Sequence, residues 1–253
     1  GPCAHPYNNE PFLLSSPQIM AASQQSNEFI LFRHCPIFPI STSCDTDVVP
    51  FADFFPMMSD EARPDIDQIT HVRKEMVQAL QDLDLIKADS EVRRYVGRVK
   101  GFLIASRSVQ NLSRFYNYFI LRWRSHLHGF SCKLTDLHFD VVMSLSTFAF
   151  SHRAVALQVL SSVLSSNPAA DELQKVVPRV GAHLRAAAGI FEYLAAQKSA
   201  LDFDLWDYDG PLLENQPQLW KGFQELSLAE FGHLLLLQAS SKKLSTTLSG
   251  KIC

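Results

Sequence analysis

Apolar residues recur every three or four positions through most of the chain after residue 63, which is the pattern of amphipathic helices. The first run begins near Pro64, because proline fits the first turn of a helix. Its apolar positions are Ile66, Ile69, Val72, Met76, Leu80 and Leu83. A second helix is predicted from about Ser90, with the apolar positions Val92, Val96, Val99, Leu103, Val109 and Leu112.

Three longer helices are predicted farther along the chain. The strongly apolar stretch 137–165 forms the first of them. The second, 168–197, contains Pro178, which is expected to kink it. The third covers about 217–249, with Gly250 as its C-cap. The predicted fold class is therefore mostly α.

The first 60 residues have a different composition, because they hold eight of the 13 prolines. Residues 1–27 are rich in Ser, Gln, Asn and Pro and are predicted to be a disordered extension. Residues 28–58 are expected to form extended segments that pack on the helices, with strand pairing near 29–40. Residues 118–127 also alternate in polarity and are predicted to be extended. We expect one domain over 28–253. The large apolar residues of 28–58 expected to be buried are Phe29, Phe32, Ile37, Phe38, Phe51, Phe54 and Phe55.

Composition and charge narrow the function classes. The chain has 253 residues, of which 47% are hydrophobic and 19% charged, as in an ordinary globular protein. A net charge of −3 argues against a domain built mainly to coat nucleic acid. The five cysteines are scattered without a C-x-x-C pair, which argues against a zinc knuckle or a disulfide framework. No secretory signal pattern and no membrane-spanning run is visible, so we expect a reduced, cytoplasmic protein.

One cluster of potential metal ligands lies in the middle of the chain. Its members are His126, His128, Asp136, His138 and Asp140. A His-x-His pair on a strand places both rings on one face, as a metal site requires. The alternative is that these are surface and loop residues, with one of the two aspartates capping a helix. Zinc sites usually show tighter ligand pairs, so the second interpretation is favoured and no metal or cofactor is expected.

Other chemical motifs are weak. The acidic run at 202–210 resembles part of a calcium loop, but its twelfth position is Leu213 or Asn215, depending on the aspartate that starts the count. A solvated loop whose apolar residues pack inward is the better interpretation. The chain contains no G-x-S-x-G, P-loop or G-x-G-x-x-G motif, so we do not expect an enzyme.

A basic stripe is predicted on the second helix. Residues 92–124 contain eight basic residues and no acidic one. Four of them, spaced by seven, fall on one side of a helix. This stripe could face an anionic membrane, or it could be a solvated face paired with the acidic N-terminal segment or with the 202–209 loop. The stripe consists of Arg93, Lys100, Arg107 and Arg114.

The last helix carries a second apolar stripe. Four consecutive leucines, 234–237, put apolar side chains on every side of the helix. Leu244, Leu248 and Ile252 continue at intervals of four, between lysines. An apolar stripe edged with lysine suits a groove for an amphipathic partner helix. From periodicity alone, packing against a neighbouring helix of the same chain is the commoner explanation.

Several short motifs, in this order, resemble the BRO domain of ESCRT adaptors, with the PalC type most similar. The sequence AAGIFEYL at 187–194 resembles the family's A-A-G-I-F-x-Y-L helix. Trp123-Arg124 followed by LHFDVV and LSTFAF at 137–150 is similar to a second family stretch. The resemblance extends to the N-terminal FPI and FADF motifs and to the helix that starts at Leu228, and it covers about 29–252.

The resemblance implies an elongated, TPR-like, boomerang-shaped helical domain without enzymatic activity. It implies that a groove on the last helix binds the C-terminal amphipathic helix of an ESCRT-III subunit. It also implies that a full domain continues beyond residue 253, so the chain is expected to be a truncated form. Gln238 replaces a lysine of other members, which weakens a charge-assisted contact. The residues that match the family's groove are Leu235, Gln238, Leu248, Lys251 and Ile252.

Three function hypotheses follow from the sequence. The first is an adaptor that binds ESCRT-III at an endosomal or plasma membrane, in endosomal sorting or PalC-like pH signalling. The second is a general helical interaction scaffold, and the third is a metal-dependent enzyme that uses the His/Asp cluster. The first hypothesis is favoured, with peripheral recruitment to the membrane.

Overall fold

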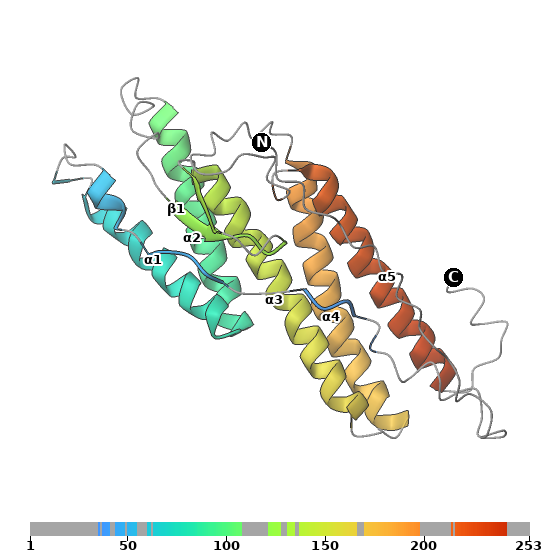
Figure 1. Ribbon diagram of the computed structural model, residues 1–253. Helices are drawn as coiled ribbons and strands as arrows, with labels where there is room; N and C mark the ends of the chain where they lie inside the picture. The colour runs from blue at the N-terminus through green and yellow to red at the C-terminus, as the bar shows by residue number, and fades with distance from the viewer. Residues whose placement is uncertain are drawn as a thin grey trace, which may run out of the picture.

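A computed structural model shows a chain built mainly of helices, as the sequence predicts (Figure 1). It describes residues 35, 37–40, 44–48, 50–54, 60–61, 63–107, 121–127, 131–134, 137–165, 170–197, 214 and 216–241. The predicted extension 1–27 lies outside these residues. The helices are η3 (Phe51–Phe54), α1 (Arg63–Gln81), α2 (Leu85–Arg107), α3 (Leu137–Ser165), α4 (Ala170–Ala196) and α5 (Pro217–Ser241), and the strands are β1 (Leu121–Arg124) and β2 (Ser131–Leu134).

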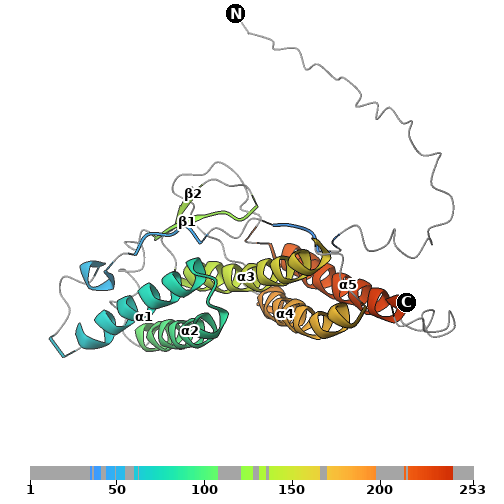
Figure 2. The ribbon, with the colours of Figure 1, turned by 90° about the horizontal axis from the view of Figure 1, so that it is seen from below.

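The long helices pack in chain order. The α1 helix packs on α2, α2 on α3, α3 on α4, and α4 on α5. Figure 2 shows β1, β2 and the blue N-terminal segment on one side of α3, with α2 and α4 on the other. The α3 helix therefore lies between the α1–α2 pair and the α4–α5 pair. It contacts α1 and α2 on one side and α4 on the other.

The turn between α1 and α2 corrects one predicted boundary. Leu83 has a φ of 55°, and its N–H and that of Asp84 donate to the carbonyl groups of Leu80 and Ala79. These two bonds form a Schellman cap that ends α1 without a glycine. The Asp84 carboxylate then accepts a bond from the N–H of Lys87, as an N-cap does. For this reason α2 begins at Leu85, five residues before the predicted start.

The remaining helices agree with the sequence over the part that is described. The α3 helix has the predicted bounds, and α4 continues through Pro178 as a single helix. The α5 helix starts at the predicted Pro217 and is described as far as Ser241, so its predicted end and Gly250 lie outside the described residues.

The extended segments differ in part from the prediction. The predicted segment 118–127 contains β1, which pairs antiparallel with β2, a strand that was not predicted. The described residues of 29–40 form no strand, and the N-terminal segment instead makes a single bridge between Thr46 and Trp123. Of the apolar residues expected to be buried there, Ile37 and Phe51 are buried. Phe38, however, is 64% exposed, because side chains alternate along an extended chain and Ile37 faces inward.

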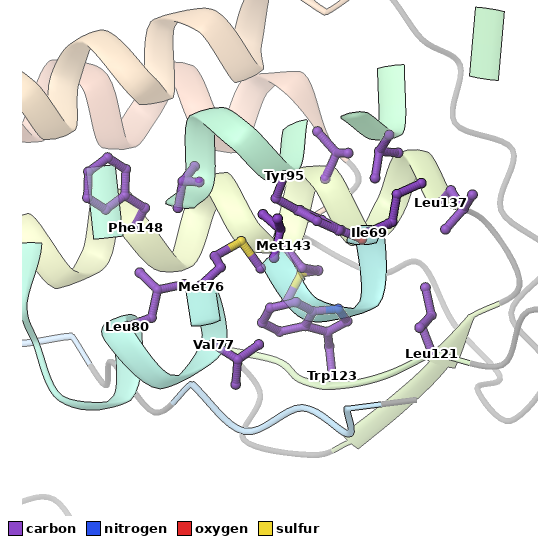
Figure 3. Packing of buried hydrophobic residues seen from close by; sticks show 14 of the residues in the cluster. Ile69, Met76, Val77, Leu80, Tyr95, Leu121, Trp123, Leu137, Met143 and Phe148 are labelled. Atoms are coloured by element: carbon purple, nitrogen blue, oxygen red, sulfur yellow. The ribbon is translucent and has the colours of Figure 1, made fainter. Parts of the chain in front are cut away.

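The largest hydrophobic cluster joins α1, α2, β1 and α3 (Figure 3). Trp123 on β1 and Tyr95 on α2 are fully buried in it, and Met143 of α3 lies close to both. Met76 and Leu80 of α1 close the other side. Two further clusters hold α3, α4 and α5 together.

A buried ion pair lies within the first cluster. Arg73 on α1 and Asp140 on α3 have no exposed side-chain surface, and Arg73 Nη2 lies 2.8 Å from Asp140 Oδ1. Arg73 Nε donates to Oδ2 at 3.0 Å. Trp123 Nε1 donates to Oδ1 at 2.6 Å, and the hydroxyl of Tyr95 donates to Oδ2. Four donors from three elements thus surround a single carboxylate.

The arginine of this pair also holds the N-terminal segment. Arg73 Nη2 donates to Thr46 Oγ1 at 2.9 Å, and Nη1 donates to the carbonyl of Asp47 at 2.5 Å. Burial lowers the pKa of Arg73, but the charge of Asp140 outweighs it and keeps the pKa above its usual value. Burial and the same carboxylate raise the pKa of Tyr95, so its hydroxyl stays a donor. Arg73 therefore keeps its charge inside the core, where it donates four hydrogen bonds.

Replacing Asp140 should destabilise the fold strongly. In Asp140→Asn, Arg73 keeps a buried charge without a counter-ion, so the free energy of unfolding should fall by about 3–5 kcal/mol. Urea denaturation measures this change. Asp89→Asn is the matched control, because it removes an exposed ion pair with Arg93 and should cost less than about 1 kcal/mol. Equal stability of Asp140→Asn and the wild type would contradict the role given to the pair.

Two glycines of α4 provide a test of the α4–α5 contact. A Cβ on Gly181 would lie 2.5 Å from the Phe231 ring of α5, whereas one on Gly189 would meet nothing within 4 Å. Gly181→Ala should therefore lower the free energy of unfolding by about 1–3 kcal/mol through overpacking. Gly189→Ala should raise it by about 0.5–1 kcal/mol through helix propensity. Urea denaturation of both variants checks the opposite signs, and a gain in stability for Gly181→Ala would show that the helices are not in close contact.

Candidate functional site

The groove residues implied by the family resemblance fall on α5 and beyond it. Leu235 and Gln238 lie on α5 and are both half-buried. Leu248, Lys251 and Ile252 lie outside the described residues. The part of the candidate site that can be examined is therefore the stretch of α5 around Leu235.

One stripe of α5 exposes apolar surface next to Leu235. Leu228 is 45% exposed and precedes Leu235 by seven residues, which puts the two side chains within about 20° of each other around the helix. A Cβ built on Gly232, between them, would meet nothing within 4 Å. We call Leu228, Gly232 and Leu235 the α5 stripe. It is apolar and only partly covered by the described residues.

The core fixes one flank of the α5 stripe, at Phe231, and the far side of the helix, at Leu234 and Leu237. Phe231 packs against Gly181, and the guanidinium carbon of Arg185 lies 5.2 Å from the centre of its ring. Leu234 and Leu237 are buried. Of the four consecutive leucines, the described contacts therefore bury two in the protein and leave Leu235 at the edge of the exposed stripe.

The AAGIFEYL helix positions α5. Its residues Ala187, Phe191 and Leu194 are buried in a cluster that includes Trp220 of α5. Phe191 stacks on Trp220 with ring centres 5.9 Å apart and an interplanar angle of 9°, and Phe150 of α3 meets Phe191 edge-on at 5.2 Å. The apolar residues of this motif thus have a structural role, because they set how α3, α4 and α5 meet.

The potential metal ligands do not come together as a site. Asp140 is engaged in the buried ion pair, and His126 is buried, with Nε2 2.9 Å from Thr147 Oγ1. His138 is exposed, whereas His128 and Asp136 lie outside the described residues. Within the described part of the chain, no three His, Cys, Asp or Glu side chains lie close enough to hold a metal ion. Asp140 therefore lies inside α3 as part of the core and does not cap the helix, whereas the alternative cap, Asp136, lies outside the described residues.

A buried polar cluster was missed by the sequence analysis. The hydroxyl of Ser125, at the end of β1, donates to the carboxylate of Glu214, a residue 89 positions later. Both side chains are buried, and the residue after Ser125, His126, is hydrogen-bonded to Thr147 of α3. A short-range sequence pattern could not reveal this cluster, because its members are far apart along the chain. Because the Ser125–Glu214 hydrogen bond is buried, its role is structural: it connects the end of β1 to the segment before α5.

The basic stripe is only partly described. Arg93 and Lys100 are exposed on α2, the side chain of Arg107 is not described, and Arg114 lies outside the described residues. Arg93 pairs with Asp89 of its own helix, and the ammonium of Lys100 donates to the hydroxyl of Tyr193 on α4. The acidic N-terminal segment pairs instead with two basic residues of β1. These pairs are Arg122–Asp47 at 3.7 Å and Arg124–Asp45 at 3.9 Å.

Two of the five cysteines have described side chains. Cys35 and Cys44 form no disulfide. Burial raises the pKa of the Cys44 thiol to about 12, so it stays protonated. Cys3, Cys132 and Cys253 and the acidic run at 202–210 fall where the structure describes no side chains.

Two histidines meet between α3 and α4. His152 Nδ1 and His183 Nδ1 lie 3.0 Å apart, so one ring donates a hydrogen bond to the other. Burial, and then the proximity of His183, lowers the pKa of His152 to about 4. Burial, and then Arg179, lowers the pKa of His183. The pair is therefore neutral at pH 7.

Comparison with known proteins gives no match to a family model, to a curated protein or to a solved structure. Among the described helices, none is both long and apolar enough to cross a membrane.

The histidine pair predicts that stability depends on pH. The pKa of His152 is near 4 in the folded state and about 6.5 in the unfolded state, so the unfolded chain takes up the proton first as the pH falls. The free energy of unfolding should therefore decrease from pH 6.5 to pH 4, with up to about 3 kcal/mol from this residue. Urea denaturation at several pH values measures the slope.

His152→Gln should make this slope shallower, whereas His71→Gln should leave it unchanged, because His71 is exposed on α1. The same slope in His152→Gln and the wild type would show that the pair does not control the pH dependence.

Proposed function

We propose that this chain is a non-enzymatic adaptor of the BRO type, and that the α5 stripe binds the C-terminal amphipathic helix of an ESCRT-III subunit. The observation that carries the proposal is the partly uncovered apolar stripe of Leu228, Gly232 and Leu235 on a helix whose other side is held firmly in the core. The proposed context is endosomal sorting or PalC-like pH signalling.

The order of motifs along the chain supports this proposal. The residues that resemble the BRO domain include Phe150 and Phe191, which pack with Trp220 where α3, α4 and α5 meet. Helices that pack on their neighbours in chain order also suit an elongated TPR-like domain. Such arrays present long surfaces on which an extended partner can lie.

The chemistry of the α5 stripe supports a helical partner. Leucines seven residues apart can meet apolar residues at i and i+7 of a partner helix, and the glycine between them allows a close approach. Glu225 and Lys221 are exposed about one and two turns before Leu228 and provide polar groups at the start of the stripe. An amphipathic helix matches this combination of an apolar centre and a polar rim.

Peripheral membrane contact is a second part of the proposal. Arg93 and Lys100 are exposed on the same side of α2, and each charge near an anionic surface contributes about 1 kcal/mol. Arg93 is paired with Asp89, however, so its contribution to the attraction between α2 and an anionic membrane is reduced. We therefore assign the membrane contact a supporting role beside the peptide contact.

The peptide contact is tested by introducing a charge into the stripe. Leu235→Asp and Leu228→Asp should each weaken binding of a labelled ESCRT-III C-terminal peptide at least tenfold, because a carboxylate would be desolvated in the interface. Leu248→Asp should act in the same way if the groove continues beyond α5. Fluorescence anisotropy measures the dissociation constants.

Ile86→Asp is the matched control, because Ile86 is 89% exposed on α2, away from the stripe. This variant should bind as the wild type does, and circular dichroism should show that all variants are folded. Unchanged binding in Leu235→Asp and Leu228→Asp would refute the assignment of the α5 stripe.

A further inference from the structure

The N-terminal segment around Phe38 is bound to the helices as a peptide ligand is bound to a receptor. Ile37 is 2% exposed and fills a site between three helices. Cys35 and Ile40 pack at the edges of two neighbouring clusters. We call the segment 35–40, of which the structure describes residues 35 and 37–40, the latch, and the surface that holds Ile37 the latch site. The aliphatic residues of this site are Ala156 and Leu160 of α3, Leu173, Val177, Val180 and Leu184 of α4, and Leu234 of α5.

A buried ion pair binds the main chain of the latch. Arg153 of α3 and Glu230 of α5 form a bidentate pair at 2.6 and 2.8 Å, with side chains 2% and 4% exposed. Glu230 Oε1 accepts the N–H of Phe38 at 2.8 Å, and Arg153 Nη2 donates to the carbonyl of Phe38 at 3.2 Å. The pair thus contacts both polar groups of one peptide residue.

The latch site binds the main chain of Phe38 and leaves most of its side chain exposed. The ring of Phe38 is 64% exposed, so the ion pair binds the backbone whatever the side chain. Selectivity comes from the preceding residue, whose aliphatic side chain occupies the core. Anchoring one side chain and hydrogen-bonding the next residue's backbone is a common mode of peptide recognition.

The arginine of the latch site has unused hydrogen-bonding capacity. Arg153 Nη1 also donates to Ser227 Oγ at 2.8 Å, which orients the guanidinium. Arg153 Nε is buried and has no hydrogen-bond partner among the described residues. Leaving a buried donor unpaired is unfavourable, so the latch does not satisfy the site completely.

The sequence of the latch, C-P-I-F-P-I, favours an extended peptide. Pro36 and Pro39 have no N–H, so neither can donate to a strand ladder. Prolines also favour an extended conformation, which lowers the entropy lost on binding. The hydrogen bonds described for Phe38 go to side chains, and an extended peptide from another molecule could form the same bonds.

We propose that the latch site is a receptor for extended peptides with an aliphatic anchor residue next to proline, and that residues 35–40 occupy it as a displaceable ligand in the same chain. The partner that this proposal names is a neutral peptide from another protein, with an aliphatic residue next to a proline. A charged side chain at the anchor position is excluded, because the site that holds Ile37 is aliphatic. The latch site is distinct from the α5 stripe, since Glu230 and Leu235 point about 140° apart around α5.

The proposal is tested by releasing the latch with one backbone change. Phe38→Pro removes the N–H that bonds to Glu230, whereas Phe38→Ala keeps that N–H and removes only the exposed ring. The probe is a fluorescein-labelled peptide with the sequence of residues 35–42, which contains no charged side chain. The tethered latch competes with it at an effective concentration on the order of millimolar, so the wild type should not bind the probe at 100 µM, a concentration about tenfold lower.

The expected result is that Phe38→Pro binds the probe at least tenfold more tightly than the wild type and Phe38→Ala. A probe with Asp at the Ile37 position should not bind Phe38→Pro. A folded Phe38→Pro chain that does not bind the probe would overturn the proposal. Global unfolding of Phe38→Pro by circular dichroism would also overturn it, because the latch would then be an inseparable part of the core. If light scattering shows that Phe38→Pro forms a dimer, the site binds a second copy of this chain. That result would contradict the proposal of a partner peptide from another protein.

Discussion

The structure depends on two charges that α3 carries into the interior, Asp140 and Arg153. A buried charge costs several kcal/mol unless it is paired and hydrogen-bonded, so each of them requires a partner from elsewhere in the chain. Asp140 finds Arg73 on α1, and Arg153 finds Glu230 on α5. Both arginines also bind a backbone carbonyl of the N-terminal segment. These contacts explain how a row of helices that pack mainly on their neighbours is tied together from α1 to α5.

Much of the helical framework could be predicted from the sequence, because the burial of a helix face leaves a periodic pattern. The bounds of α3 follow from its apolar composition. The partner of Asp140 could not be predicted, since Arg73 is 67 residues away and nothing local distinguishes a buried aspartate from a capping one. The α1–α2 turn was misplaced because Leu83 takes the left-handed conformation that usually indicates glycine. The β2 strand, Ser131–Leu134, is too short for its pattern to be distinctive.

For the candidate site, the sequence predicted the helix that carries Leu235 but not which sides of that helix are buried. Leu235 was assigned correctly to the last helix, but periodicity could not show which of four consecutive leucines face the core. The structure buries Leu234 and Leu237 and leaves Leu228 exposed beside Leu235. The α5 helix therefore has two different surfaces, an apolar stripe that suits a helix and a charged residue, Glu230, that holds an extended segment. The second surface depends on contacts across about 190 residues, so no local pattern could reveal it.

The central claim is that the outer stripe of α5 binds an amphipathic helix. The most direct test is to map the contact by nuclear magnetic resonance, with an isotopically labelled chain and an unlabelled ESCRT-III C-terminal peptide. The account predicts that amide shifts change along α5 between Leu228 and Gln238, while those of α1 and of residues 37–40 stay the same. Shifts confined to α1 and α2, or no change at saturating peptide, would contradict it.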